Sequence, residues 1–136
     1  MIYVDASAIV AMILGEPDAA TLAGALDGGD SAITSALAIY EASLAIARVN
    51  AIPAAAAKDA IHLTLSRMSI AVAPIDESQG DIAVSAFDRF GKGRHPAALN
   101  MGDCFAYACA VAHNARILFK GQDFSQTDLR SALAAS

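Results

Sequence analysis

The sequence predicts an α/β domain built around a central parallel sheet of four to five strands flanked by helices. Short apolar runs of strand length alternate along the chain with longer stretches whose apolar residues recur at helical spacing. This alternation is typical of parallel sheets whose strands are joined by helices. A chain of 136 residues is long enough for one such core and too short for two, so we expect a single domain over residues 1–136.

The strands are expected where short apolar runs stand between turn signals. They cover residues 2–4, 31–34, 70–73 and 116–119. Gly28 and Gly29 mark the turn before the second run, and Pro74 closes the third.

The helices are expected between these strands, most of them with a start or stop signal of their own. Gly15 ends the first helix, Ser35 caps the third, and Pro53 begins the fourth. Ser78 is expected to cap the fifth helix. The predicted helices span residues 7–14, 18–26, 35–49, 53–69, 78–90 and 102–114, and a short last helix starts at Asp128.

Composition and charge exclude two classes of protein. Hydrophobic residues make up 56% of the chain and charged residues 17%, which excludes a disordered protein. The balance of 9 Lys+Arg against 14 Asp+Glu gives a net charge of -5, which excludes a generally basic nucleic-acid binder. A role on nucleic acid must therefore depend on a local basic patch or on metal ions held by the acids.

The cysteines and the N-terminus indicate a reducing, cytoplasmic location. Cys104 and Cys109 lie five positions apart in one predicted helix, so they face different directions and we expect buried free thiols instead of a disulfide. The chain opens without a basic segment, and it lacks an apolar run approaching the roughly 18 residues of a membrane span.

Acidic residues follow the predicted strands. Asp5 comes directly after the first strand, and Asp123 lies four residues beyond the last. Glu41 lies six residues into the helix that starts at Ser35, and Asp103 opens the helix of residues 102–114. Because ligands of parallel sheets bind beyond the carboxyl ends of the strands, we expect these four carboxylates to converge.

Each acid also has a structural interpretation. Asp5 can cap the helix that follows it, Asp103 suits a helix N-terminus, and Asp123 suits a turn. Glu41 stands among apolar neighbours, where a purely solvated role is harder to arrange. Asp76, three residues beyond the third strand, is expected to cap a helix and not to join the cluster.

A cluster of carboxylates without a basic partner indicates metal chemistry. Such groups repel one another unless they are protonated or neutralised by a divalent cation. Oxygen ligands suit Mg²⁺ or Mn²⁺ and not zinc. Metal ions held in this way can orient a phosphodiester and activate water, so the cluster favours a nuclease.

Four segments, spread nearly end to end along the chain, each carry one of these acids. Residues 2–10 carry Asp5 and the hydroxyl of Ser7, and residues 34–42 carry Glu41. Residues 91–104 carry Asp103, and residues 118–124 carry Asp123. Together the four segments resemble the acidic motifs of the PIN-domain ribonucleases, and most closely those of the VapC-like toxins of bacterial type II toxin-antitoxin systems. Residues 91–104 form the most specific match.

The resemblance implies a PIN fold and Mg²⁺- or Mn²⁺-dependent endonuclease cleavage of RNA, which leaves a 5′-phosphate and a 3′-hydroxyl. It implies that Asp5, Glu41 and Asp103 are the metal ligands and that Asp123 acts directly or through water. It further implies a homodimer and a VapB-like antitoxin whose C-terminal segment covers the acidic site, where a basic side chain would fit the charge.

A basic segment precedes Asp103. Arg89, Lys92, Arg94 and His95 place four cationic or titratable side chains within seven positions, which makes them candidates for contact with RNA phosphates. A solvated loop without a ligand is the alternative for these residues.

Three other protein classes also place acids at strand ends or share this fold. A phosphoacceptor receiver-like domain needs a pair of acids after its first strand, whereas Asp5 is followed by Ala6 and Ser7. A haloacid-dehalogenase-type phosphatase needs Asp-x-Asp, and position 7 is serine. A catalytically inactive PIN-fold binding module has no need of all four acidic positions, and they are present.

Overall fold

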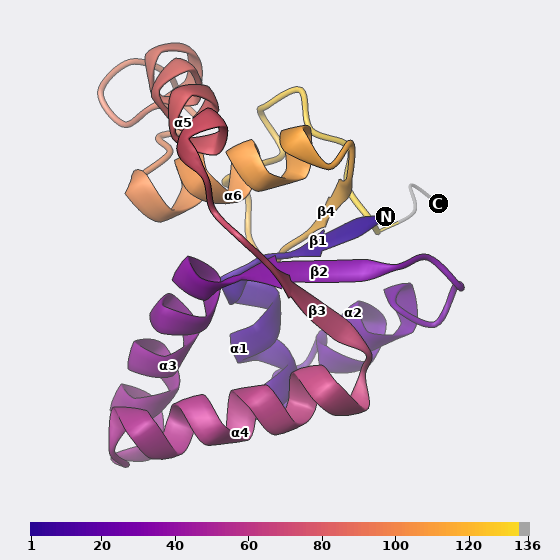
Figure 1. Ribbon diagram of the computed structural model, residues 1–136. Coiled ribbons are helices and arrows are strands. Elements are labelled where there is room, and N and C mark those ends of the chain that lie inside the picture. The colour runs from indigo at the N-terminus through magenta and orange to yellow at the C-terminus, as the bar shows by residue number, and fades with distance from the viewer. Residues whose placement is uncertain (134–136) are drawn as a thin grey trace.

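Four parallel strands form one sheet in the order β3-β2-β1-β4. The computed structural model describes residues 1–133 of the chain (Figure 1). The strands are β1 (Ile2–Val4), β2 (Ala32–Ser35), β3 (Ile70–Ala73) and β4 (Arg116–Leu118). The predicted parallel sheet is confirmed, at the lower of the two expected strand numbers. The central strand β1 pairs on both sides, with Tyr3 opposite Ile33 and Ile117.

Helices cover both faces of this sheet (Figure 1). One face carries α1 (Ala6–Leu14), α2 (Ala19–Ala25), α3 (Ala36–Asn50) and α4 (Ala54–Arg67). The other face carries α5 (Glu77–Phe90) and α6 (Met101–Ala112). Each layer has its own apolar core: Ile2 and Val4 of β1 pack with α1 to α4, whereas Tyr3 packs with α5 and α6. Neighbouring residues of β1 therefore contribute to both cores, as do residues of the other strands.

The start of α5 differs from the prediction. Asp76 caps this helix by accepting a hydrogen bond from Gln79 N at 3.1 Å, so the predicted cap at Ser78 is wrong. The Ser78 hydroxyl lies inside the first turn and donates to Asp76 Oδ1 at 2.7 Å. An ionised carboxylate accepts both bonds at once, which makes Asp76 the stronger cap. The capping role predicted for Asp76 is confirmed, as is that of Ser35, whose Oγ accepts from Ala38 N.

The short last helix predicted from Asp128 is wrong. Residues 130–132 run instead along β4, where Ile117 N donates to Arg130 O at 2.9 Å and Ala132 N donates to Ile117 O at 2.8 Å. Asp128 itself is held by the Tyr107 hydroxyl at 2.6 Å. The exposed backbone edge of β4 needs hydrogen-bond partners, and an extended segment supplies them where a helix would not.

Cys104 and Cys109 are both buried and free, which confirms the predicted absence of a disulfide between them. Both thiols belong to the core beneath α6, where burial raises the pKa of Cys109 to about 11. Within residues 1–133, the helices are too short or too polar to span a bilayer.

Candidate active site

The four predicted acids lie on four different segments around the carboxyl end of the sheet. Asp5 follows β1 and is the N-cap of α1. Glu41 lies in the second turn of α3, which leaves the end of β2. Asp103 lies in the first turn of α6, and Asp123 lies in the exposed loop after β4. Asp5, Asp103 and Asp123 are close enough for their charges to act on one another, and the charges of Asp5 and Asp103 also act on Glu41.

Asp5 is the most buried of the four, with 7% of its surface exposed. Its Oδ2 accepts hydrogen bonds from Ser7 Oγ at 2.6 Å and from Ser7 N at 3.1 Å. Its backbone N–H donates to Leu118 O at 3.0 Å, at the end of β4. Both side-chain bonds go to one oxygen, so the capping interpretation and a role in the site are compatible.

Ser7 connects Asp5 to the loop that carries Asp123. Its hydroxyl donates to Asp5 Oδ2 and accepts from Lys120 N at 3.0 Å. The peptide group of Lys120 stands three residues before Asp123. One half-buried hydroxyl therefore holds the first acid and the start of the last acidic loop together.

Asp103 forms a reciprocal capping box with Asn100. Asp103 N donates to Asn100 Oδ1 at 2.9 Å, and Asn100 N donates to Asp103 Oδ2 at 3.1 Å. Asp103 is thus the helix N-terminal acid that its position suggests, and the capping box also fixes its carboxylate beside the other acids.

Burial and mutual repulsion raise the pKa values of three acids. Burial raises the pKa of Glu41 to about 7, and the charges of Asp5 and Asp103 add to the effect. Burial also raises the pKa of Asp103 to about 6, a hydrogen bond from Asn100 opposes it, and the charges of Asp123 and Asp5 reinforce it. The pKa of Asp5 is raised mainly by burial. The site therefore holds more negative charge than its surroundings stabilise.

Lys120, in the loop after β4, pairs with acids other than these four. It forms ion pairs with Glu16 and with Asp18, the latter at 3.5 Å, in the turn between α1 and α2. Lys120 and Glu16 also line a groove of about 510 Å³ that runs past Ser7 and Glu41. Because Glu41 lines this groove, the groove gives a ligand a path to the acids. Neither the groove nor the ion pairs of Lys120 are predicted from the sequence, because Lys120 lies about 100 residues from Glu16 and Asp18.

The donor atoms fit a hard divalent cation. All four side chains offer carboxylate oxygens, the ligands that Mg²⁺ and Mn²⁺ prefer. Within residues 1–133, however, no three His, Cys, Asp or Glu side chains are grouped tightly enough to hold a metal ion as they stand. The acids therefore share one electrostatic environment without forming a closed coordination shell.

The predicted basic segment covers the end of α5, where Arg89 lies, and a closed loop between α5 and α6 that carries Lys92, Arg94 and His95. Lys92 N donates to Leu99 O at 3.0 Å, and Leu99 N donates to Phe90 O at 3.0 Å. Lys92 is exposed, and it forms no ion pair with another residue of the described range 1–133. His95 Nδ1 accepts from Ala97 N inside the loop. The loop ends at the capping box of Asp103, which places it next to the acids.

The two arginines of this segment already have partners. Arg89 donates to the Tyr107 hydroxyl and to Asp128 Oδ2, both at 3.2 Å. Arg94 pairs with Asp88 at 3.7 Å and lies over the ring of Phe87. Both side chains remain more than half exposed, so they can still meet a ligand, although their charges are partly offset.

Comparison with known proteins identifies the family. The PIN domain profile matches residues 2–129. Ribonuclease VapC from Mycolicibacterium smegmatis is 40% identical over 126 residues, covering 93% of this chain and 95% of the relative. Ribonuclease VapC30 from Mycobacterium tuberculosis is 36% identical over 126 residues, covering 93% of this chain and 94% of the relative.

A solved structure shows the same fold. VapC20 from Mycobacterium tuberculosis, described as a toxin that cleaves the sarcin-ricin loop, superposes with a TM-score of 0.72 at 18% identity and covers 95% of this chain and 96% of its own. The profile match, the relatives and this fold agree with one another. The chain therefore belongs to the PIN-domain family, among the VapC ribonucleases.

Proposed function

We propose that this chain is a metal-dependent endoribonuclease, the toxin of a VapBC-like toxin-antitoxin pair, which hydrolyses RNA phosphodiester bonds. The observation that carries the proposal is the group of interacting acids at the carboxyl edge of the sheet, in a chain 36–40% identical to VapC ribonucleases over most of its length. Family membership removes the receiver-like alternative. A catalytically inactive PIN-fold binding module is the alternative that experiment decides.

In this proposal Asp5, Glu41 and Asp103 hold Mg²⁺ or Mn²⁺, and Asp123 acts on the metal directly or through water. The bound metal would supply positive charge at the phosphate and activate water for hydrolysis to a 5′-phosphate and a 3′-hydroxyl. Ser7 orients Asp5, and the Asn100 capping box orients Asp103. Glu41, whose pKa burial raises to about 7, would have to be ionised to hold a cation.

The RNA is proposed to lie between the groove at Glu41 and the basic loop. Arg89, Lys92, Arg94 and His95 are the proposed contacts to phosphates. The loop ends directly before Asn100 and Asp103, so a strand bound along it would pass the acidic site. We propose a cytoplasmic location, because that is where a bacterial RNA substrate would be met.

Two apolar surfaces support the proposed protein partners. The exposed side chains of Tyr40 and Leu44 line a groove of about 370 Å³ between α3 and α4, on the helix that carries Glu41. A VapB-like antitoxin segment seated there would bring a basic side chain to the acids.

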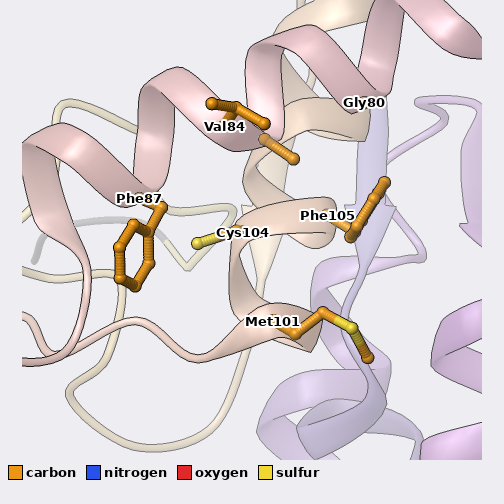
Figure 2. Close-up of a pocket in the computed structure, with 7 residues that line it drawn as sticks. Gly80, Val84, Phe87, Met101, Cys104 and Phe105 are labelled. Atoms are coloured by element: carbon orange, nitrogen blue, oxygen red, sulfur yellow. The ribbon is translucent and has the colours of Figure 1, made fainter.

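The second surface lies between α5 and α6 and supports a homodimer. Figure 2 shows Val84 and Phe87 of α5 facing Met101 and Phe105 of α6 across this groove of about 300 Å³. Val84 and Met101 are about two-thirds exposed, at 67% and 68%. Apolar side chains gathered in this way favour contact with a second copy of the chain.

The decisive experiment compares cleavage of bacterial RNA by the parent, Asp5→Asn, Asp103→Asn and Asp81→Asn in Mg²⁺ or Mn²⁺. Asp81 is an exposed acid on α5 and serves as the matched control. We expect the first two variants to lose about 100-fold or more in rate, equivalent to about 2.7 kcal/mol, and the control to match the parent. Sequencing of the RNA ends should find 5′-phosphates. Equal cleavage by the parent and Asp103→Asn, or RNA binding without metal-dependent cleavage, would reject the proposal.

A further inference from the structure

Gly102 is buried in the first turn of α6 and lies against the carboxylate of Glu41. A Cβ atom at position 102 would come within 2.4 Å of both carboxylate oxygens of Glu41 and within 2.5 Å of its Cδ. Real Cβ contacts do not approach so closely, so any side chain at this position would force Glu41 to move. The two residues come from different helices, 61 positions apart in the sequence.

Position 102 requires glycine because there is no room for a side chain, and not because of its backbone conformation. The left-handed glycines of the described chain are Gly15, Gly29, Gly93 and Gly121, and Gly102 is not among them. Two other helical glycines, Gly80 in α5 and Gly24 in α2, have open space where a Cβ would lie. Glycine destabilises a helix relative to alanine, so at position 102 that cost is matched by the room it gives to Glu41.

We propose that Gly102 is a positioning residue of the metal site: its missing side chain lets Glu41 of α3 reach α6 beside Asp103. The proposal rests on the proposed function, because it assigns Glu41 and Asp103 to one cation. The charge of Asp103, the residue after Gly102, already raises the pKa of Glu41. A methyl group at 102 would separate the two carboxylates and leave the rest of the fold in place.

The predicted signature of Gly102→Ala is loss of metal affinity without loss of stability. The atoms in the way are the end of a flexible side chain, which can turn aside without disturbing backbone. We expect Mn²⁺ affinity to fall about 10- to 100-fold, the range seen when groups that orient metal ligands are removed. The metal-free protein should unfold at the same urea concentration as the parent or at a higher one.

The test measures Mn²⁺ binding to the metal-free full-length chain by calorimetry and unfolding by urea in EDTA. Gly80→Ala and Gly24→Ala are the controls: each should keep the parent's Mn²⁺ affinity and raise the folding equilibrium constant by up to about fivefold. A double-mutant cycle that combines Gly102→Ala with Glu41→Ala then isolates the effect of the contact between these two residues. With the carboxylate removed, Gly102→Ala should no longer change Mn²⁺ affinity and should stabilise as the controls do.

The outcomes separate this inference from the proposed function. If the parent binds Mn²⁺ and Gly102→Ala binds it equally well, the positioning role is wrong and the metal site stands. If Gly102→Ala weakens binding to the same extent with and without the Glu41 carboxylate, the role does not act through Glu41 and is also wrong. If the parent binds neither Mn²⁺ nor Mg²⁺, the proposed metal site fails, and this inference fails with it.

Discussion

The hydroxyl of Tyr3 lies 3.0 Å from Ser35 Oγ, and both side chains are buried. Ser35 Oγ also accepts from Ala38 N, so the same atom caps α3 and meets β1. Tyr3 stands two residues before Asp5, and Ser35 stands six residues before Glu41. This hydrogen bond therefore sets the start of the helix that carries one acid relative to the strand that carries another.

Tyr3→Phe should loosen this junction without creating a cavity. Removal of one buried hydrogen bond is expected to lower the free energy of unfolding by about 1 kcal/mol. Because the position of α3 relative to Asp5 becomes less well defined, Mn²⁺ affinity should fall as well. Urea unfolding in EDTA and calorimetric titration measure the two effects.

Tyr40→Phe is the matched control, since Tyr40 is 60% exposed, whereas Tyr3 is buried. It should leave both stability and metal affinity unchanged. Parent-like Mn²⁺ affinity in Tyr3→Phe would show that the Tyr3–Ser35 contact serves stability alone.

The sequence was sufficient for features whose cause is local. The sheet, the cap at Ser35 and the position of the acids after the strands follow from apolar periodicity and strand ends, and the structure agrees. The cap of α5 was misplaced by two residues because Asp76 and Ser78 both suit the position and only their mutual hydrogen bond decides it.

Features with a long-range cause were not accessible. Nothing near Gly102 in the sequence indicates that Glu41 fills the space beside it. The last helix was predicted at Asp128 from local signals, whereas Tyr107 and the edge of β4 hold that segment extended. Ion pairs of Lys120 with Glu16 and Asp18 depend on the same kind of distant contact.

Ser7→Ala should weaken the site through Asp5. The substitution removes the 2.6 Å hydrogen bond to Asp5 Oδ2 and the acceptor for Lys120 N. In the parent, the hydrogen bond from the Ser7 hydroxyl lowers the pKa of Asp5. Without this bond the pKa of Asp5 should rise further, so metal binding should weaken. We expect about 1 kcal/mol less stability, because the hydrogen bonds that the Ser7 hydroxyl makes with Asp5 and with Lys120 N are both lost. Ser7→Thr keeps the hydroxyl and should restore metal affinity; failure of this rescue would argue against the hydrogen bond as the cause.

Stability of the metal-free protein should fall as pH rises from about 4.5 to 7.5. The folded pKa values of Glu41 and Asp103, about 7 and about 6, lie above those of the unfolded chain. The folded state therefore binds more protons than the unfolded state in this pH range. The resulting stabilisation is complete at pH values below the pKa values of the unfolded chain, and it is lost as the pH rises through the pKa values of the folded chain. Both groups are partly exposed, so the effect is expected to be on the order of 1 kcal/mol after solvent screening.

Urea unfolding in EDTA at several pH values measures this slope, and Glu41→Gln with Asp103→Asn should flatten it. Added Mn²⁺ should reverse the trend, because a cation that binds only the folded state stabilises it most where the carboxylates are ionised. A slope as steep in the double variant as in the parent would assign the effect to groups other than Glu41 and Asp103.

Lys92→Ala should reduce the salt dependence of RNA binding more than Arg89→Ala does. Lys92 is exposed on the loop beside Asp103, whereas Arg89 is engaged by Asp128 and Tyr107. Loss of one phosphate contact to single-stranded RNA should lower the slope of log K against log salt by about 0.7. Arg89→Ala should mainly lower thermal stability. Binding is measured with a site made inactive by Asp5→Asn, and equal slopes for the parent and Lys92→Ala would exclude Lys92 as a contact.

Val84→Glu should dissociate the proposed homodimer without unfolding the chain. Val84 is 67% exposed on the groove between α5 and α6, so a charged side chain there costs little in the monomer but would be buried in a dimer (Figure 2). Analytical ultracentrifugation should show a dimer for the parent and a monomer for the variant, with unchanged urea unfolding at low protein concentration. Val49→Glu is the matched control, because Val49 is 64% exposed near the end of α3, away from this groove, and it should remain dimeric. A parent that sediments as a monomer would refute the homodimer, and a dimer that tolerates Val84→Glu would place its interface on another face of the molecule.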